Sequence, residues 1–221
     1  MSDTITAPTY KESLKGLIQQ LSEMLPEDKF AVFNHDAKQL GETYTSPLKL
    51  NLGDKAPSFS LPNATGKTVS LDDLLQQGAV VLTFYRGAWC PYCNLELKTY
   101  QQILPQIKQT GANLVAVSPM TPDHSLQMKD SNELQFEVLS DVGNKVASRF
   151  TTVFKNPETS IQAMADLGYD FHSFYNDSTA EIPVPATFVI AQDGTIQFAG
   201  TAGGDYRERI EPQKILDVLA Q

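Results

Sequence analysis

Residues 79–97 read AVVLTFYRGAWCPYCNLEL, and this stretch contains both cysteines of the 221-residue chain. Its first seven residues form a continuous apolar run, which is typical of a strand covered on both faces. A helical pattern follows from about residue 91 to residue 110, and Gly111 is a natural stop. The cysteines therefore lie where a core strand turns into a helix, at the carboxyl end of the strand, where open α/β sheets usually place their sites.

The position and spacing of the two cysteines favour redox chemistry. We expect Cys90 at the cap or first turn of the helix, where unpaired N–H groups and the helix dipole lower the pKa of a thiol. Pro91 suits the first turn because it has no N–H to satisfy. Cys93 follows by nearly one turn, so the two sulfurs can face each other and close a disulfide. The pair predicts a reversible dithiol/disulfide switch.

Two other roles for the cysteines carry less weight. Buried structural cysteines would not need Trp, Pro and Tyr around the thiols. A zinc site needs about four ligands, and the three histidines, His35, His124 and His172, show no paired spacing that would complete one. We expect no metal. Trp89, next to the first cysteine, fits core packing and substrate contact equally well.

Composition limits the class of protein. The formal net charge is −9 and the isoelectric point is about 4.8, so nucleic acids and anionic membranes would be repelled. No run approaches the roughly 18 apolar residues that span a bilayer, and the N-terminal stretch lacks the pattern of a signal peptide. We expect a cytoplasmic protein with no nucleic-acid or membrane partner. In such a reducing compartment a lone CxxC is not expected to be a permanent cross-link.

Residues 1–50 are expected to form an N-terminal helical extension. Apolar residues recur at helical spacing from Leu14 to Leu25, and Pro26 begins a second helix for which Gly41 is the expected stop. The apolar faces of these helices must be covered, either by the main domain or by a second subunit in a homodimer.

The remaining residues, 51–221, are expected to form one α/β domain. A hairpin and a short helix precede the cysteine stretch. Buried strands at 113–117 and 136–139 alternate with helices, and a hairpin at 187–199 leads into a final helix at 210–219. Residues 151–182 fit neither period and are interpreted as an insertion. This order predicts a central mixed sheet flanked by helices.

Four stretches together resemble a known family. They are GDKAPSFSLPNATGKTVSLDDL from Gly53, FYRGAWCPYC from Phe84, LSDVGNKVASRF from Leu139 and VPATFVIAQDGTIQFAG from Val184. In combination they resemble the thioredoxin-fold superfamily, and within it the peroxiredoxin-like branch of the alkyl hydroperoxide reductase/thiol-specific antioxidant (AhpC/TSA) family. The resemblance implies a thioredoxin-like fold. It also implies that Pro185 is a cis proline beside the sulfurs, where it would contact substrate.

The resemblance gives the two cysteines different roles in two registers. Counted from the aromatic pair that ends the strand, Cys93 stands at the peroxide-attacking position of peroxiredoxins, and Cys90 replaces a threonine. Glu96 completes a CxxE spacing found in some branches. In the thioredoxin and glutaredoxin register, Cys90 attacks and Cys93 resolves. We lean to Cys93 for peroxide and to Cys90 for disulfides.

One family residue is absent. Peroxiredoxins commonly carry an arginine just before the Thr-Phe strand, where this chain has Pro185-Ala186. Arg86 and Arg149 are the candidates to replace it, although each could equally be an ordinary surface cation.

The resemblance implies a thiol peroxidase that reduces hydrogen peroxide or organic hydroperoxides without a cofactor. Cys90 and Cys93 would be the catalytic residues and Trp89 and Pro185 the substrate contacts. Thioredoxin, glutaredoxin or glutathione would reduce the intramolecular disulfide. Two alternatives stay open: a dithiol-disulfide oxidoreductase, and a non-catalytic protein whose CxxC controls binding to a partner.

Overall fold

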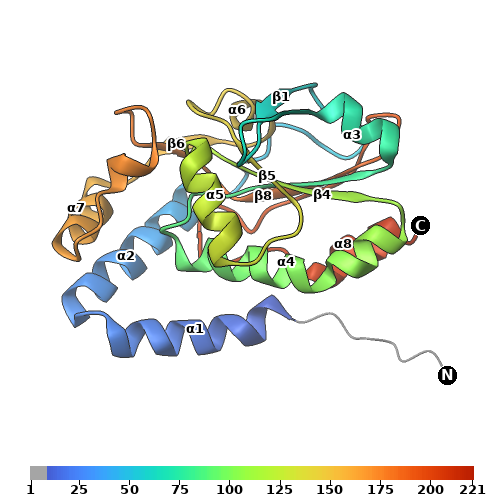
Figure 1. Cartoon of the computed structure of the whole chain (residues 1–221). Helices are drawn as coiled ribbons and strands as arrows, with labels where there is room; N and C mark the ends of the chain where they lie inside the picture. Colours follow the sequence, from blue (N-terminus) through green and yellow to red (C-terminus); the bar gives the residue numbers. More distant parts are fainter. Residues whose placement is uncertain (1–8) are drawn as a thin grey trace.

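The computed structural model describes residues 9–221, which build a five-stranded sheet with helices on both faces (Figure 1). The strand order is β5 (Glu137–Ser140), β4 (Asn113–Ser118), β3 (Val80–Phe84), β8 (Ala186–Ile190) and β9 (Ile196–Gly200). β3, β4 and β5 run parallel, while β8 is antiparallel to both β3 and β9. The predicted α/β class with a central mixed sheet is confirmed.

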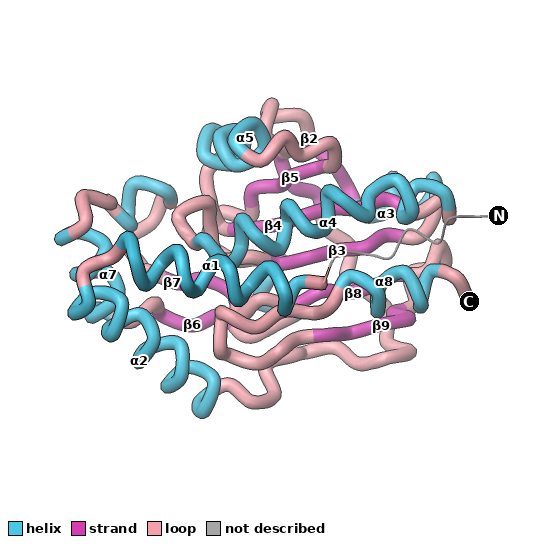
Figure 2. Tube along the Cα trace, turned by 90° about the horizontal axis from the view of Figure 1, so that it is seen from below, coloured by secondary structure: helices cyan, strands magenta, loops and turns pink. Residues whose placement is uncertain are grey.

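The central strands are apolar because helices cover them on both sides. Every residue of β3 and β8 is buried. One face packs against α4 (Pro91–Gln109) and α8 (Pro212–Leu219), and α1 (Tyr10–Met24) packs on the outer side of α4 (Figure 2). The other face packs against α3 (Leu71–Gln77) and α6 (Ala147–Phe150). α5 (Pro122–Ser131) follows β4 and contacts β5. The alternation of strand and helix thus yields two hydrophobic cores, one on each face.

The N-terminal helices pack on the rest of the same chain. α1 lies against α4, and α2 (Glu27–Thr43) lies against α7 (Glu158–Asp166). Polar contacts fix both helices: the Tyr10 hydroxyl donates to the Arg207 carbonyl at 2.8 Å, and Asp36 accepts hydrogen bonds of 2.7 Å from Thr159 and Ser160. Each apolar stripe is therefore covered only in part within one chain: Leu14 and Leu40 are buried, whereas Ile18 stays 37% exposed. The boundary at residue 50 and the homodimer stay predictions.

Gly41 does not end the second helix, which continues to Thr43. Its role is a close approach instead, because a Cβ atom at this position would lie only 3.0 Å from the Cβ of Asp205. The glycine lets the segment after β9 pass directly over α2.

Residues 151–182, interpreted as an insertion, contain four short elements. These are β6 (Val153–Lys155), α7, a 3₁₀ helix at Phe171–Phe174 and β7 (Glu181–Pro183). β6 and β7 pair antiparallel as a separate two-stranded sheet, and β1 (Ser60–Pro62) pairs in the same way with β2 (Thr68–Ser70). Strands of three residues are too short to show a period in the sequence. No helix among residues 9–221 is long and apolar enough to cross a membrane.

Candidate active site

Cys90 is the N-cap of α4 and Pro91 is its first residue, as predicted from the sequence. The Cys90 carbonyl accepts the Asn94 N–H at 3.1 Å, which starts the helix, and the Asn94 side chain donates to the Ala88 carbonyl at 2.7 Å. Both cysteines are free thiols and both are buried, with 1% of Cys90 and none of Cys93 exposed. The turn therefore holds two reduced sulfurs at the positive end of a 19-residue helix.

On the interior side of the turn, Cys93 lies beside a buried ion pair. Arg209, from the segment that precedes α8, donates from Nη2 to the Cys93 sulfur at 3.3 Å and from Nε to Glu96 Oε2 at 2.8 Å. The side chains of Arg209 and Glu96 are each only 2% exposed. Burial raises the pKa of Glu96 to about 7, although the charge of Arg209 opposes this rise.

On the other side, Arg86 is a buried cation with no carboxylate partner among residues 9–221. Its Nη2 donates to Asn156 Oδ1 at 2.9 Å, while its Nε has no hydrogen-bond partner. The guanidinium carbon lies 3.8 Å from the ring centroid of Tyr206 and 4.6 Å from that of Trp89. These cation–π contacts compensate part of the desolvation of Arg86 but leave its charge unneutralised.

The two thiols differ in acidity. Burial opposes ionisation of Cys90, but a hydrogen bond with Cys93 and the positive charges of Arg86 and Arg209 outweigh it and lower the Cys90 pKa to about 6. Burial and the same hydrogen bond raise the pKa of Cys93 well above its ordinary value. Cys90 is therefore the thiol that ionises near neutral pH, with Cys93 as its hydrogen-bond partner.

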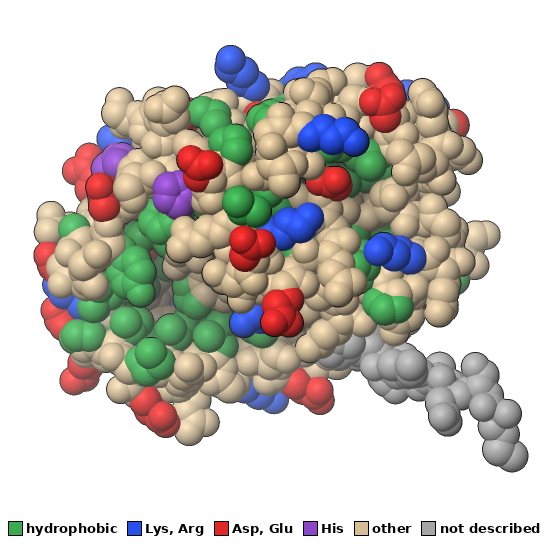
Figure 3. Space-filling model, in the orientation of Figure 1, with side chains coloured by type: hydrophobic (Ala, Val, Ile, Leu, Met, Phe, Trp, Pro, Cys, Tyr) green, Lys and Arg blue, Asp and Glu red, His purple; other side chains and the backbone are tan. Residues whose placement is uncertain are grey.

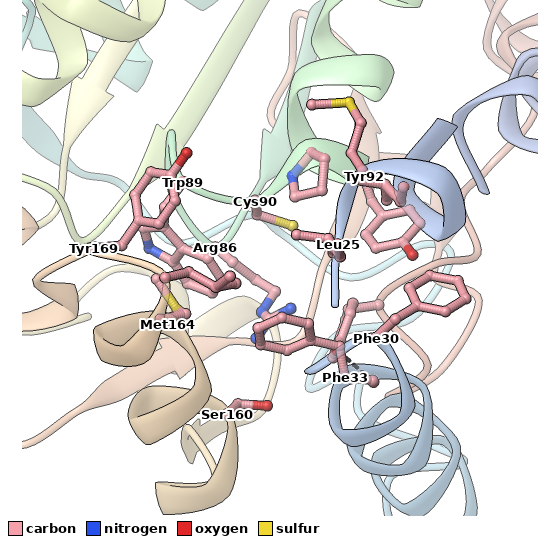
Figure 4. A pocket seen from close by; sticks show the side chains of 15 residues that line it. Leu25, Phe30, Phe33, Arg86, Trp89, Cys90, Tyr92, Ser160, Met164 and Tyr169 are labelled. Carbon is pink, nitrogen blue, oxygen red and sulfur yellow. Dashed lines mark hydrogen bonds between the residues drawn. The ribbon is translucent and has the colours of Figure 1, made fainter. Parts of the chain in front are cut away.

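Cys90 opens onto a cavity of about 230 Å³ between the N-terminal helices and α7 (Figure 4). Arg86, Trp89 and Tyr206 line it next to Cys90, and Cys93 does not reach it. Figure 3 shows hydrophobic side chains gathered around a hollow over this part of the molecule. An ionisable sulfur, an unneutralised cation and a partly open, mainly apolar cavity thus meet at one point, which is the arrangement of a site for nucleophilic chemistry.

The structure places only some of the predicted site residues beside the cavity. Trp89 lies beside Cys90, lines the cavity and donates from Nε1 to the Tyr175 hydroxyl at 2.7 Å, so it both packs and faces the site. Arg86 is at the site and is not a surface cation. Arg149 is elsewhere, exposed, and donates to the Ser58 carbonyl at 3.1 Å.

The cis form inferred for Pro185 is wrong, because the Val184–Pro185 bond is trans. Hydrogen bonds hold this segment extended: the Val184 N–H donates to the Thr152 carbonyl at 2.8 Å, and Thr201 donates to the Pro185 carbonyl at 2.8 Å. The trans isomer is also the intrinsically favoured one. Pro185 is buried and does not line the cavity, so its contact with substrate stays a prediction.

Sequence reasoning missed Arg209. It stands 116 positions from Cys93 in the charged run around Tyr206, and no spacing links it to the CxxC. The Glu96 position drew attention through its CxxE spacing, and a buried carboxylate normally requires a cation, but the sequence does not tell which one. Among the residues that the structure describes, no three His, Cys, Asp or Glu side chains are grouped to hold a metal ion.

Comparison with known proteins places this geometry in a family. The model of the AhpC/TSA family matches residues 52–199. A putative peroxiredoxin of Mycobacterium tuberculosis is 30% identical over 155 residues, covering 70% of this chain and 87% of the relative. The peroxiredoxin Bcp of Escherichia coli is 31% identical over 105 residues, covering 48% of this chain and 65% of the relative. The chain therefore belongs to the AhpC/TSA family.

Solved structures agree on the fold. The crystal structure of peroxidoxin BcpB from Mycobacterium tuberculosis superposes with a TM-score of 0.60 at 23% identity, covering 77% of this chain and 97% of the other. A cysteine-to-serine mutant of PrxQ from Xylella fastidiosa gives a TM-score of 0.58 at 17% identity, covering 77% and 96%. The domain thus has the thioredoxin-like fold that these proteins share. The family match does not extend to α1 and α2.

Proposed function

We infer that the protein is a thiol peroxidase in which Cys90 attacks the peroxide and Cys93 resolves the product, in place of the attack by Cys93 that the peroxiredoxin register favoured. The observation that carries this assignment is the environment of Cys90. Its pKa is lowered to about 6, it caps α4, and it shares a cavity with the unneutralised Arg86. The names of the relatives, peroxiredoxins, support the reaction class.

The cycle needs only the two thiols and a reductant. The Cys90 thiolate attacks one peroxide oxygen, the O–O bond breaks, and the departing oxygen leaves as water or an alcohol after taking a proton. The Arg86 guanidinium, which faces the same space, would donate a hydrogen bond to that oxygen as negative charge develops. Cys90 is then a sulfenic acid.

Resolution uses the interior side of the turn. Cys93 loses its proton and attacks the Cys90 sulfur, an S–S bond forms, and the hydroxyl leaves as water. Arg209, at 3.3 Å from the Cys93 sulfur, would stabilise the thiolate that develops there. Thioredoxin, glutaredoxin or glutathione then supplies two electrons to reopen the disulfide, and the reducing cytoplasm is the compartment that fits this cycle.

A dithiol-disulfide oxidoreductase is the second candidate, and the recessed position of Cys93 favours it. Thiol–disulfide exchange requires an acidic first cysteine that a substrate can reach and a second cysteine recessed behind it, and Cys90 with its cavity and Cys93 have this arrangement. A binding protein controlled by the CxxC finds less support, because it would not require the lowered pKa of Cys90.

Initial rates separate these functions. Peroxide consumption is measured with thioredoxin, glutaredoxin and glutathione supplied one at a time, and disulfide reduction is measured in parallel. The proposal expects peroxide-dependent turnover with at least one reductant and an oxidised product that runs as a monomer on a non-reducing gel. Turnover of disulfides alone would replace the peroxidase by the oxidoreductase, and inactivity in both assays would contradict both.

A further inference from the structure

The wall of the cavity opposite Cys90 comes from the N-terminal helices. Leu21 of α1, Leu25 at its end, and Phe30 and Phe33 of α2 line it, and all four lie outside the residues that match the family model. Met164 and Leu167 close the side formed by α7. One wall of this apolar chamber is thus built from helices outside the residues that match the family model, and the remainder comes mostly from the matched domain.

Few polar groups inside the chamber are free to bind a ligand. Ser160 is engaged with Asp36 at 2.7 Å, and the Tyr206 hydroxyl donates to the Phe33 carbonyl at 2.7 Å. The Nε of Arg86 is buried without a partner, at the same end as the Cys90 sulfur. A ligand that fits has a polar end that accepts a hydrogen bond from Arg86 and an apolar remainder.

The volume of the chamber indicates the size of that ligand. At about 230 Å³ it is smaller than the roughly 300–1,000 Å³ of sites for drug-sized ligands. It suits a compact organic molecule. Hydrogen peroxide would leave most of the apolar wall without a contact. A hydrocarbon group would instead remove its own apolar surface and that of the wall from water.

We propose that this chamber makes compact apolar organic hydroperoxides the preferred substrates, with α1 and α2 as the elements that determine specificity. The hydrocarbon group lies against Leu25, Phe30 and Phe33, and the hydroperoxyl group lies between Cys90 and Arg86. The inference rests on the proposed peroxidase function. The Cys90 thiolate takes the terminal oxygen of R–O–O–H, the O–O bond breaks, and RO⁻ takes a proton and leaves as the alcohol. Cys93 and the dithiol reductant then complete the cycle.

The test compares cumene hydroperoxide with hydrogen peroxide in the wild type, in Leu25→Phe and in Ile18→Phe. Leu25→Phe narrows the chamber. Ile18→Phe is the matched control, because Ile18 is 37% exposed on α1 and does not line the cavity. We expect kcat/KM for cumene hydroperoxide to exceed that for hydrogen peroxide by roughly tenfold or more, the scale on which hydrophobic pockets discriminate. Leu25→Phe should abolish most of this preference, and Ile18→Phe should retain it.

Binding gives a second readout that does not depend on turnover. Trp89 is the single tryptophan of the chain and lines the cavity, so its fluorescence reports occupancy. The unreactive alcohol 2-phenylpropan-2-ol should perturb it in the wild type and in Ile18→Phe, and more weakly in Leu25→Phe. Turnover without preference for cumene hydroperoxide, or a preference and fluorescence response that Leu25→Phe leaves unchanged, would overturn this inference and leave the peroxidase function standing. No turnover with either peroxide would overturn both.

Discussion

The two sides of the CPYC turn each hold a buried arginine, and they use its charge differently. Beside Cys93, Arg209 is neutralised by Glu96 at 2.8 Å and also contacts the sulfur. Beside Cys90, Arg86 has an amide, two aromatic rings and a cavity around it, and no carboxylate among residues 9–221. One side is a closed ion pair, and the other keeps its positive charge available.

The hydrogen bond between the two thiols is the main cause of the lowered pKa of Cys90, and the difference between the arginines adds to it. A cation that is already paired changes the pKa of its neighbour less than an unpaired one does, because the carboxylate cancels much of its field. In the proposed cycle Arg86 would therefore favour the Cys90 thiolate and an anionic leaving oxygen, while the Arg209–Glu96 pair orders the interior. Different results are expected when each cation is removed. Loss of Arg209 should lower the stability of the protein, and loss of Arg86 should lower the reactivity of Cys90.

The largest effect is expected from Arg209→Met, which leaves Glu96 buried without its partner. Removing one member of a buried pair costs about 3–5 kcal/mol, because the remaining charge must be protonated or desolvated. Urea denaturation should show this loss in the free energy of unfolding. Burial raises the pKa of Glu96 to about 7 against the opposing charge of Arg209, so this pKa is higher still in the variant. The deficit should therefore shrink as the pH falls toward 7 and the carboxyl of the variant becomes protonated, and it should level off below that value.

Arg207→Met is the matched control for this variant. Arg207 precedes Arg209 by only two positions and pairs with Asp205 at 2.6 Å. Unlike Arg209, its side chain is 25% exposed. Its loss should cost about 1 kcal/mol or less, as is usual for pairs near the surface. Equal destabilisation by the two variants would show that the buried pair has no special role.

A moderate effect on rate, with little effect on stability, is expected from Arg86→Met. Removal of the charge raises the pKa of Cys90 above about 6, so the thiolate fraction at neutral pH falls. The departing oxygen also loses a hydrogen-bond donor. The second-order rate constant with peroxide at pH 7 should drop about tenfold or more, and the midpoint of its pH profile should move upward.

Arg149→Met is the control for Arg86→Met. It removes an exposed cation that contacts the Ser58 carbonyl and lies away from the site. Its pH profile should match the wild type. An unchanged midpoint in Arg86→Met would mean that Arg86 does not set the acidity of Cys90.

The smallest effect is expected from Tyr10→Phe, which removes a hydrogen bond between α1 and the segment before α8. The Tyr10 hydroxyl ties α1 to the Arg207 carbonyl at 2.8 Å, close to the segment that carries Arg209. Loss of one such hydrogen bond should lower the free energy of unfolding by about 1 kcal/mol. Thermal denaturation measures it, and a loss as large as that of Arg209→Met would assign the extension a much greater role in stability.

The parts of the fold that could be predicted from the sequence are those with long periodic patterns. The apolar run before Cys90 predicted β3, and the cap position of Cys90 with Pro91 followed from the preferences of helix N-termini. The elements in 151–182 were missed because strands of three residues and a short helix show no clear period. Gly41 was misread because a glycine required for close approach looks the same in sequence as one that ends a helix.

The candidate site was predictable where it is local and unpredictable where it depends on tertiary contacts. Cys90, Cys93, Trp89 and Glu96 lie within one turn and its helix. Arg209 and the walls of the cavity reach the turn only because α1, α2, α7 and the segment after β9 fold over it. The expectation of a cis Pro185 was wrong for a related reason. It came from the family resemblance, which does not reveal the tertiary hydrogen bonds that this segment makes.

The most direct test of the division between the two thiols is the reaction of single-cysteine variants with peroxide across the pH range. Serine keeps a hydroxyl donor at the replaced position, so Cys93→Ser leaves Cys90 a hydrogen-bond partner. We predict that Cys93→Ser forms a trappable sulfenic acid rapidly, with a rate that rises with pH and levels off above a midpoint near 6, because the thiolate is the reactive form. Cys90→Ser should react no faster than a free thiol, because Cys93 does not reach the cavity and burial raises its pKa. A fast reaction in Cys90→Ser and a slow one in Cys93→Ser would contradict the account and assign peroxide attack to Cys93.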